Sequence, residues 1–271
     1  MKPAPFSYHR PRSLAHALEL LSGLEDAKLI AGGQSLGPMM NMRLVQPAEL
    51  IDLNAVAGLD FIAEKENVLE IGALARHHSV ESSTLVKKHC PLLAEAAGAI
   101  GHYAIRSRGT LGGSLAHADP AAQLPLVAAT LGSEIVVAGK RGERRIAAKD
   151  FFVSMMTTAL EPDEIVVSVR FPKAAPGDRH AYLQFSRRTG DFAIVAVGAV
   201  LRAKELRVGI GGVEDRPVVI ENIQSRDPAE VAEAARTVVH PAENPRVPAL
   251  YRKELVEVLV KRAVAKCLTS S

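Results

Sequence analysis

The sequence predicts an α+β fold in which two α/β units are followed by a unit of antiparallel strands and helices. Helical and strand patterns alternate over the first two thirds of the chain. A stretch rich in Pro, Gly and Ala between Lys173 and Arg179 then interrupts the pattern, and strands with short turns follow it. We therefore expect units at residues 1–54, 55–175 and 176–271.

The first unit is expected to begin with a helix. Ser13 can cap a helix that ends at Gly23 and has Leu14, Ala17, Leu18 and Leu21 on its apolar face. Strands are expected at 28–31 and 49–53, on either side of a glycine-rich stretch.

The second unit alternates strands with helices, and Pro91 and Pro120 serve as first-turn prolines. The expected elements are a strand at 68–74, helices at 79–88, 91–100 and 120–131, and strands at 133–138 and 164–171.

The third unit is expected to contain strands at 181–187, 193–202 and 205–211 and helices at 228–239 and 248–268. The apolar face of the last helix consists of Val256, Leu259, Val260, Ala263, Val264 and Cys267. Packing on the sheet of the same unit is the usual role of such a face, and a partner-binding role is the alternative.

Composition excludes several classes of function. The net charge of +3 is small and its basic residues are scattered, which gives nucleic-acid binding little support. Two cysteines, Cys90 and Cys267, cannot supply a four-thiolate cluster, and the nine histidines show no HExxH spacing, so we expect no metal site. No apolar run approaches the length of a transmembrane segment and no leader pattern is present, so we expect a cytoplasmic protein.

Two glycine-rich stretches are the candidate binding elements. Gly32-Gly-Gln-Ser-Leu-Gly37 and Gly109-Thr-Leu-Gly-Gly-Ser114 match neither the GxGxxG nor the P-loop fingerprint. Each could be a turn in which glycine is present only for steric reasons, with no ligand bound. Because both read as two glycines followed by small polar residues and Leu, we favour loops that grip one polyanionic ligand with N–H groups and hydroxyls.

A serine hydrolase is the alternative. Gly33-Gln-Ser-Leu-Gly37 satisfies GxSxG, with Ser35 as the nucleophile after a predicted strand. Asp119, Asp191 and His180 are the available partners for Ser35.

Three motifs in order resemble the FAD-binding medium subunit of molybdenum hydroxylases, the xanthine dehydrogenase and carbon monoxide dehydrogenase family. They are Ala31-Gly-Gly-Gln-Ser-Leu-x-Pro-Met-Met, Thr110-Leu-Gly-Gly-Ser-Leu-Ala-His-Ala-Asp-Pro-Ala-Ala and Arg187-Arg-x-Gly-Asp191-Phe-Ala. The resemblance covers nearly the whole chain. It implies a vanillyl-alcohol-oxidase/PCMH-like FAD-binding region of two α/β subdomains and a C-terminal domain like that of CO dehydrogenase flavoproteins.

The resemblance also implies a set of FAD-binding residues. They are Leu29, Ile30, Ala31, Gly32, Gly33, Gln34, Ser35 and Leu36 on one side, Thr110, Leu111, Gly112, Gly113 and Ser114 on the other, and Asp119, Gln123 and Phe192. Asp119 would bond the polar middle of FAD, or else be a helix N-terminal acid. Gln123 stands where many relatives have an acid. Phe192 would lie near the isoalloxazine ring, with an ordinary core position as the alternative, and His77 is expected to be structural.

The implied activity is that of an oxidoreductase subunit with no catalytic acid or base of its own. A large subunit would carry the molybdopterin cofactor and a small one two [2Fe–2S] clusters, in a dimer of heterotrimers. FAD on this chain would pass electrons to the terminal acceptor. A further alternative is an assembly subunit that has lost the cofactor, against which the glycines at 32, 33, 112 and 113 argue.

Overall fold

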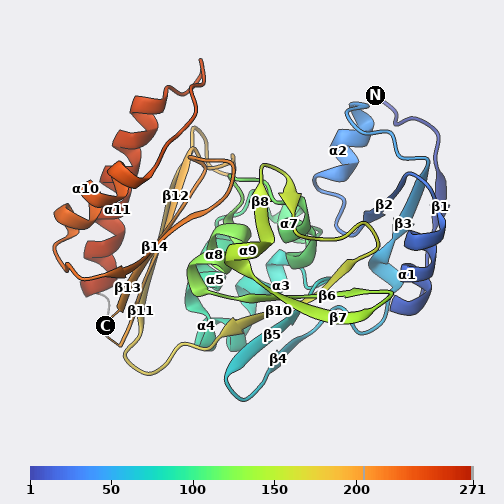
Figure 1. Ribbon diagram of the computed structural model, residues 1–271, viewed down its shortest axis with the longest axis horizontal. Helices are drawn as coiled ribbons and strands as arrows, with labels where there is room; N and C mark the ends of the chain where they lie inside the picture. The colour runs from blue at the N-terminus through green and yellow to red at the C-terminus, as the bar shows by residue number, and fades with distance from the viewer. Residues whose placement is uncertain (204, 270–271) are drawn as a thin grey trace.

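The computed structural model describes residues 1–203 and 205–269, and arranges them around three main sheets (Figure 1). A small sheet near the N-terminus, a five-stranded sheet in the middle and a four-stranded sheet near the C-terminus follow one another along the longest axis of the molecule. The predicted α+β class with a C-terminal antiparallel sheet is confirmed.

The N-terminal sheet contains three parallel strands in the order β1-β3-β2. Its elements are β1 (Ser7–His9), α1 (Leu14–Gly23), β2 (Ala27–Ile30), α2 (Leu36–Asn41), β3 (Glu49–Asp52) and the 3-10 turn η1 (Leu53–Ala55). Ser13 caps α1 as predicted, because its hydroxyl accepts from His16 N at 3.2 Å. The sequence did not predict β1, since three mostly exposed residues give no periodic signal.

The middle sheet is antiparallel throughout, in the order β4-β5-β10-β6-β7. Its strands are β4 (Ile62–Glu64), β5 (Val68–Gly72), β6 (Glu134–Gly139), β7 (Gly142–Ala147) and β10 (Ile165–Pro172). A β-bulge between Val166 and Ser168 shifts the alternation of β10. Ile165 and Val167 therefore pack toward the N-terminal unit, and Val169 and Phe171 pack on the opposite side against helices.

The other elements of the middle unit lie between these strands in the chain. They are α3 (His77–Ser82), α4 (Thr84–His89), α5 (Pro91–Gly98), α6 (Tyr103–Arg106), α7 (Leu111–His117), α8 (Gln123–Leu131), α9 (Ala148–Phe151) and the hairpin β8 (Phe152–Ser154) and β9 (Thr157–Thr158).

Two predicted helices of this unit differ from the structure. The helix expected at 79–88 is two helices, because Ser83 leaves the helical conformation with a ψ of 127° and its hydroxyl caps α4 by accepting from Val86 N. The helix expected from Pro120 begins only at Gln123, because Asp119 Oδ1 accepts from Ala121 N and holds the preceding residues in a turn.

The C-terminal sheet is antiparallel, in the order β11-β12-β13-β14, and lies between two layers of helices (Figure 1). The elements are β11 (Arg179–Phe185), β12 (Val195–Arg202), β13 (Glu205–Gly211), β14 (Val218–Ile223), α10 (Pro228–Val238) and α11 (Ala249–Thr269). Helix α11 packs on one face of the sheet, and α8 of the middle unit packs on the other. The predicted unit boundaries at 54 and 175 stay a prediction.

Helix α11 buries the apolar face that the sequence predicts. All six residues of that face have 6% exposure or less and belong to the core between α11 and the C-terminal sheet. The prediction that this face packs on the sheet of the same unit is therefore confirmed, and the alternative of a partner-binding role for it is wrong. Within the described residues, no helix is both long and apolar enough to span a membrane.

Candidate functional site

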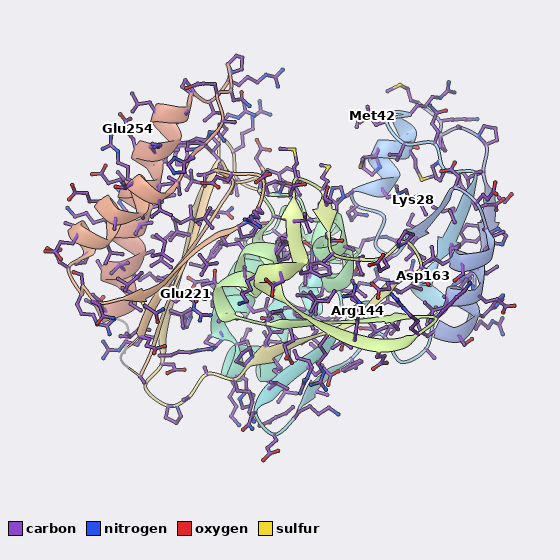
Figure 2. The ribbon with its side chains drawn as sticks, viewed as in Figure 1. Lys28, Met42, Arg144, Asp163, Glu221 and Glu254 are labelled. Carbon is purple, nitrogen blue, oxygen red and sulfur yellow. The ribbon has the colours of Figure 1, made fainter. Side chains whose placement is uncertain are left out.

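A cleft of about 470 Å³ lies between the N-terminal unit and the middle unit, and Phe192 extends it toward the C-terminal unit. One wall is the segment from Lys28 to Leu36, and the facing wall comes from α7, the start of α8 and the two residues that follow β5. Lys28 is labelled in Figure 2, beneath α2 on the wall that the N-terminal unit contributes.

The structure brings together nearly all the residues predicted to bind a cofactor. Those lining the cleft are Leu29, Ile30, Ala31, Gly32, Gly33, Gln34, Ser35, Leu36, Thr110, Gly112, Gly113, Ser114, Asp119, Gln123 and Phe192. Leu111 is the exception, because its side chain is fully buried in the core of the middle unit and its N–H donates to Ala75 O.

The first glycine-rich stretch presents free backbone donors. Gly33 adopts a positive φ of 70°, which reverses the chain between β2 and α2. Within the part of the chain that the structure describes, the N–H groups of residues 32–35 donate to no protein acceptor. Ser35 precedes α2, and its side chain makes no capping bond. A row of N–H groups next to a free hydroxyl is suited to an anion.

Gly32 also brings the two glycine-rich stretches into direct contact. A Cβ atom on Gly32 would overlap the carbonyl oxygen of Arg108 and lie 2.8 Å from Gly109 Cα. Both neighbours are backbone atoms and cannot rotate away. Glycine is therefore required here by the close approach of the two segments that line the cleft.

The second stretch is not the loop that the sequence predicts. Residues 111–117 form helix α7, and Thr110 caps it by accepting from Gly113 N at 3.2 Å. The N–H groups of Leu111 and Gly112 donate to Ala75 O and Ala73 O. A Cβ on Gly112 would lie 2.5 Å from Ala73 Cβ, so this glycine serves packing. The facing wall therefore offers the Thr110 and Ser114 hydroxyls rather than a row of N–H groups.

The remaining predicted residues differ in exposure. Asp119 is half-buried, lines the cleft and accepts from Ala121 N at 2.8 Å. It lies three residues before Ala122, the N-cap of α8, so it is not a helix N-terminal acid, and its bond to FAD stays a prediction. Gln123 is buried, and its Nε2 donates to Gln184 Oε1 at 3.0 Å. Phe192 is 61% exposed. The alternative that Phe192 is an ordinary core aromatic is therefore wrong.

His77 binds the backbone of the second glycine-rich stretch and stays neutral at pH 7. Its Nε2 lies 2.9 Å from Thr110 O, and since a carbonyl can only accept, Nε2 carries the proton. Burial lowers the pKa of His77 to about 4, although the bond to Thr110 opposes that shift. A structural role for His77 agrees with these contacts, and the ring also lines the cleft.

Several lining residues were not predicted from the sequence. Ala73 and Leu74 follow β5, Ile100 precedes α6, Ile105 lies in α6, and Met156 lies in the β8–β9 hairpin. They are single apolar residues without a motif, so no sequence signal separates them from core residues. The remaining unpredicted members of the lining are Lys28, Met39, Val45, Leu53, Gly109, Ala116, His117, Ala122, Leu160, Glu164, Ile165 and Val166.

Only part of the hydrolase alternative comes together, because Asp119 lines the cleft with Ser35 but His180 and Asp191 are not in its lining. His180 lines a separate cavity of about 20 Å³ beside Arg202, and Asp191 is absent from the described lining of the cleft. Ser35 has a φ of −109°, so the turn carries its positive φ at Gly33 instead of at the serine. A nucleophile elbow places the serine itself on the strained turn and needs its histidine within reach.

The cleft fits a dinucleotide such as FAD. Free N–H groups and the Ser35 hydroxyl lie on one wall, and the Thr110 and Ser114 hydroxyls lie on the other. Gly32 allows the close approach of the two backbone segments, and apolar side chains supply most of the remaining surface. Small-molecule sites share this combination of apolar lining with few placed polar groups.

Comparisons with known proteins agree with this cleft. Residues 4–174 match the family described as the FAD binding domain in molybdopterin dehydrogenase, and residues 180–267 match the CO dehydrogenase flavoprotein C-terminal domain. The chain is 39% identical to the 6-hydroxypseudooxynicotine dehydrogenase complex subunit alpha of Paenarthrobacter nicotinovorans, over 99% of this chain and 96% of that protein. It is 36% identical to the carbon monoxide dehydrogenase medium chain of Hydrogenophaga pseudoflava, over 97% of each. A structure of reconstituted CO dehydrogenase from Oligotropha carboxidovorans superimposes with a TM-score of 0.95 at 32% identity, over 100% of each chain.

Proposed function

Because the chain belongs to the family of FAD-binding subunits of molybdopterin-dependent dehydrogenases, we propose that it is the electron-transfer subunit of a molybdenum hydroxylase complex. The family resemblance, the FAD cofactor and the oxidoreductase class expected from the sequence are thereby confirmed. In the proposal, electrons arrive from [2Fe–2S] clusters on a partner subunit and leave through FAD to a terminal acceptor.

The observation that carries the proposal is the row of free N–H groups at residues 32–35, on the wall of a cleft large enough for a cofactor. These donors, with the Ser35 hydroxyl, would hold the pyrophosphate of FAD. The facing hydroxyls of Thr110 and Ser114 would hold the cofactor from the other side.

Other residues would set the position of the flavin. Phe192, exposed at the edge of the cleft, would lie against the isoalloxazine ring. Asp119 and Gln123 would bond polar groups of the cofactor. When bound, FAD supplies the redox chemistry, and the protein fixes its position and tunes its potential. No acid or base of this chain is assigned to a reaction step.

The partners proposed are a large molybdopterin-binding subunit and a small [2Fe–2S] subunit, assembled as a dimer of heterotrimers. Two relatives are named as a medium chain and as a subunit of a dehydrogenase complex, which supports a multi-subunit assembly. The two cysteines of this chain are buried and free, so the clusters of the proposal would be held by another chain. The expected cytoplasmic location stays a prediction that cell fractionation tests.

Affinity purification of the tagged full-length chain from its native cells tests the proposal. A large molybdenum-containing subunit and a small cysteine-rich subunit should co-elute, with one FAD per copy of this chain. A colourless chain that elutes alone and takes up no added FAD would refute it.

A further inference from the structure

A chain of side-chain hydrogen bonds connects the two glycine-rich stretches behind the wall of the cleft. Asn54, which follows β3, donates from Nδ2 to Ala31 O at 2.7 Å. The Nη2 of Arg76 donates to Asn54 Oδ1 at 2.6 Å, and its Nη1 donates to Arg108 O. Neither Asn54 nor Arg76 is among the residues that line the cleft.

The bond from Asn54 fixes the direction of one peptide. A trans peptide is planar, so its C=O and N–H groups point in opposite directions. Because Ala31 O is turned toward Asn54, behind the wall, the N–H of Gly32 is turned to the other side, where Gly32 lines the cleft. That N–H has no protein acceptor among the described residues.

The bonds from Arg76 fix the distance between the walls. Arg108 O, which Arg76 holds, is the backbone atom that a Cβ on Gly32 would overlap. One guanidinium thus fastens the segment before Gly109 and, through Asn54, the segment before Gly32. Arg76 is half-buried, and the planar fork of arginine reaches two acceptors at fixed geometry, which a lysine ammonium cannot reproduce.

Asn54 is itself held from its other side. Asp52 Oδ1 accepts from the backbone N of Asn54 at 2.9 Å and from Nδ2 at 2.5 Å. Tyr8 donates to the second oxygen of Asp52 at 2.5 Å. The amide of Asn54 therefore has a fixed orientation, with Oδ1 left for Arg76.

We infer that Arg76, acting through Asn54, is a positioning residue for the cofactor: it touches no ligand but aims the Gly32 N–H into the cleft and holds the two glycine-rich stretches together. This inference rests on the proposed function, because it assigns the aimed N–H to the FAD pyrophosphate. Loss of the Arg76 bonds should weaken FAD binding more than it destabilises the fold.

The test compares FAD titrations of five proteins, followed by flavin fluorescence, with the melting temperature of each protein measured without FAD. They are the wild type, Arg76→Lys, Asn54→Ala, the double variant of these two changes and the control Arg202→Lys. Arg202 is also half-buried and donates to a backbone carbonyl, Pro172 O at 3.2 Å, beside Asp178, but lines the separate small cavity. Riboflavin, which lacks the pyrophosphate, is titrated in parallel.

For Arg76→Lys we expect the Kd for FAD to rise about tenfold, since the charge-assisted bond to the partly buried Asn54 Oδ1 is lost. Riboflavin should bind as to the wild type, and Arg202→Lys should keep the wild-type Kd for FAD. Asn54→Ala should weaken FAD binding similarly, and the double variant should bind no more weakly than either single variant, because both act on one peptide.

A Kd for Arg76→Lys within about twofold of that for Arg202→Lys would overturn the inference. An equal loss of riboflavin affinity would also overturn it, because Arg76 would then not act through the binding of the pyrophosphate. If Arg76→Lys fails to fold, Asn54→Ala decides alone by the same criteria. Failure of the wild type to bind FAD would instead refute the proposed function.

Discussion

Replacement of Gly32 by alanine tests the contact between the two glycine-rich stretches. The new Cβ would lie 2.8 Å from Gly109 Cα and 2.9 Å from Arg108 C, and would overlap the Arg108 carbonyl oxygen. These are backbone atoms, so the walls of the cleft must move apart. Overpacking of this kind costs about 1–3 kcal/mol. If this cost is lost from the free energy of FAD binding, the Kd for FAD should rise about 5- to 150-fold, since 1.4 kcal/mol is a factor of ten.

Gly37→Ala is the matched control for this prediction, because Gly37 lies in α2 and a Cβ there would meet nothing within 4 Å. Alanine in a helix should leave FAD affinity unchanged and stabilise the fold by about 0.5–1 kcal/mol. Fluorescence titration with FAD and thermal melting measure both quantities. Wild-type affinity in Gly32→Ala, or an equal loss in Gly37→Ala, would refute the reasoning.

Three further outcomes are expected. Ser35→Ala should weaken FAD binding about 2- to 10-fold through one lost hydrogen bond, and a fluorophosphonate probe should label neither this variant nor the wild type; labelling of the wild type at Ser35 would revive the hydrolase. The folded pKa of His77 is lowered from 6.5 to about 4, so its contribution is complete above pH 6.5 and is lost as pH falls toward 4. The free energy of unfolding should therefore drop by about 1 kcal/mol from pH 7.5 to pH 5.5 because of His77. The variant His77→Gln should not show this part of the pH dependence. Burial raises the pKa of Cys90 to about 12 and also raises that of Cys267, so an aromatic disulfide reagent should modify neither thiol until the chain is denatured.

The elements with strong local signals were predicted closely. They are the Ser13 cap of α1, strand β10 and the buried face of α11. In each case the local residue pattern and the packing in the folded chain favour the same element. The first glycine-rich stretch lines the cleft, as a binding element would, and its contact with FAD stays a prediction. The serine elbow in the same stretch was excluded only once His180 was seen to line another cavity.

The second stretch shows where sequence reasoning failed. Two adjacent glycines within seven residues indicate a loop, since glycine weakens a helix. In the structure, Thr110 caps α7 locally, and the carbonyls of Ala73 and Ala75 accept from the N–H groups of its first two residues. The bonds to Ala73 and Ala75 join residues far apart in the sequence, so no local pattern predicts them. For the same reason the Asn54–Arg76 connection had no sequence signal.

The most direct test of the central claim is anaerobic stopped-flow mixing of the FAD-loaded chain with the proposed partner, a small subunit whose [2Fe–2S] clusters have first been reduced. We predict that the flavin absorbance falls to its reduced level in step with reoxidation of the clusters. The same chain stripped of FAD should leave the clusters reduced. Clusters that reoxidise equally fast without FAD, or flavin that stays oxidised beside reduced clusters, would contradict electron transfer through this subunit.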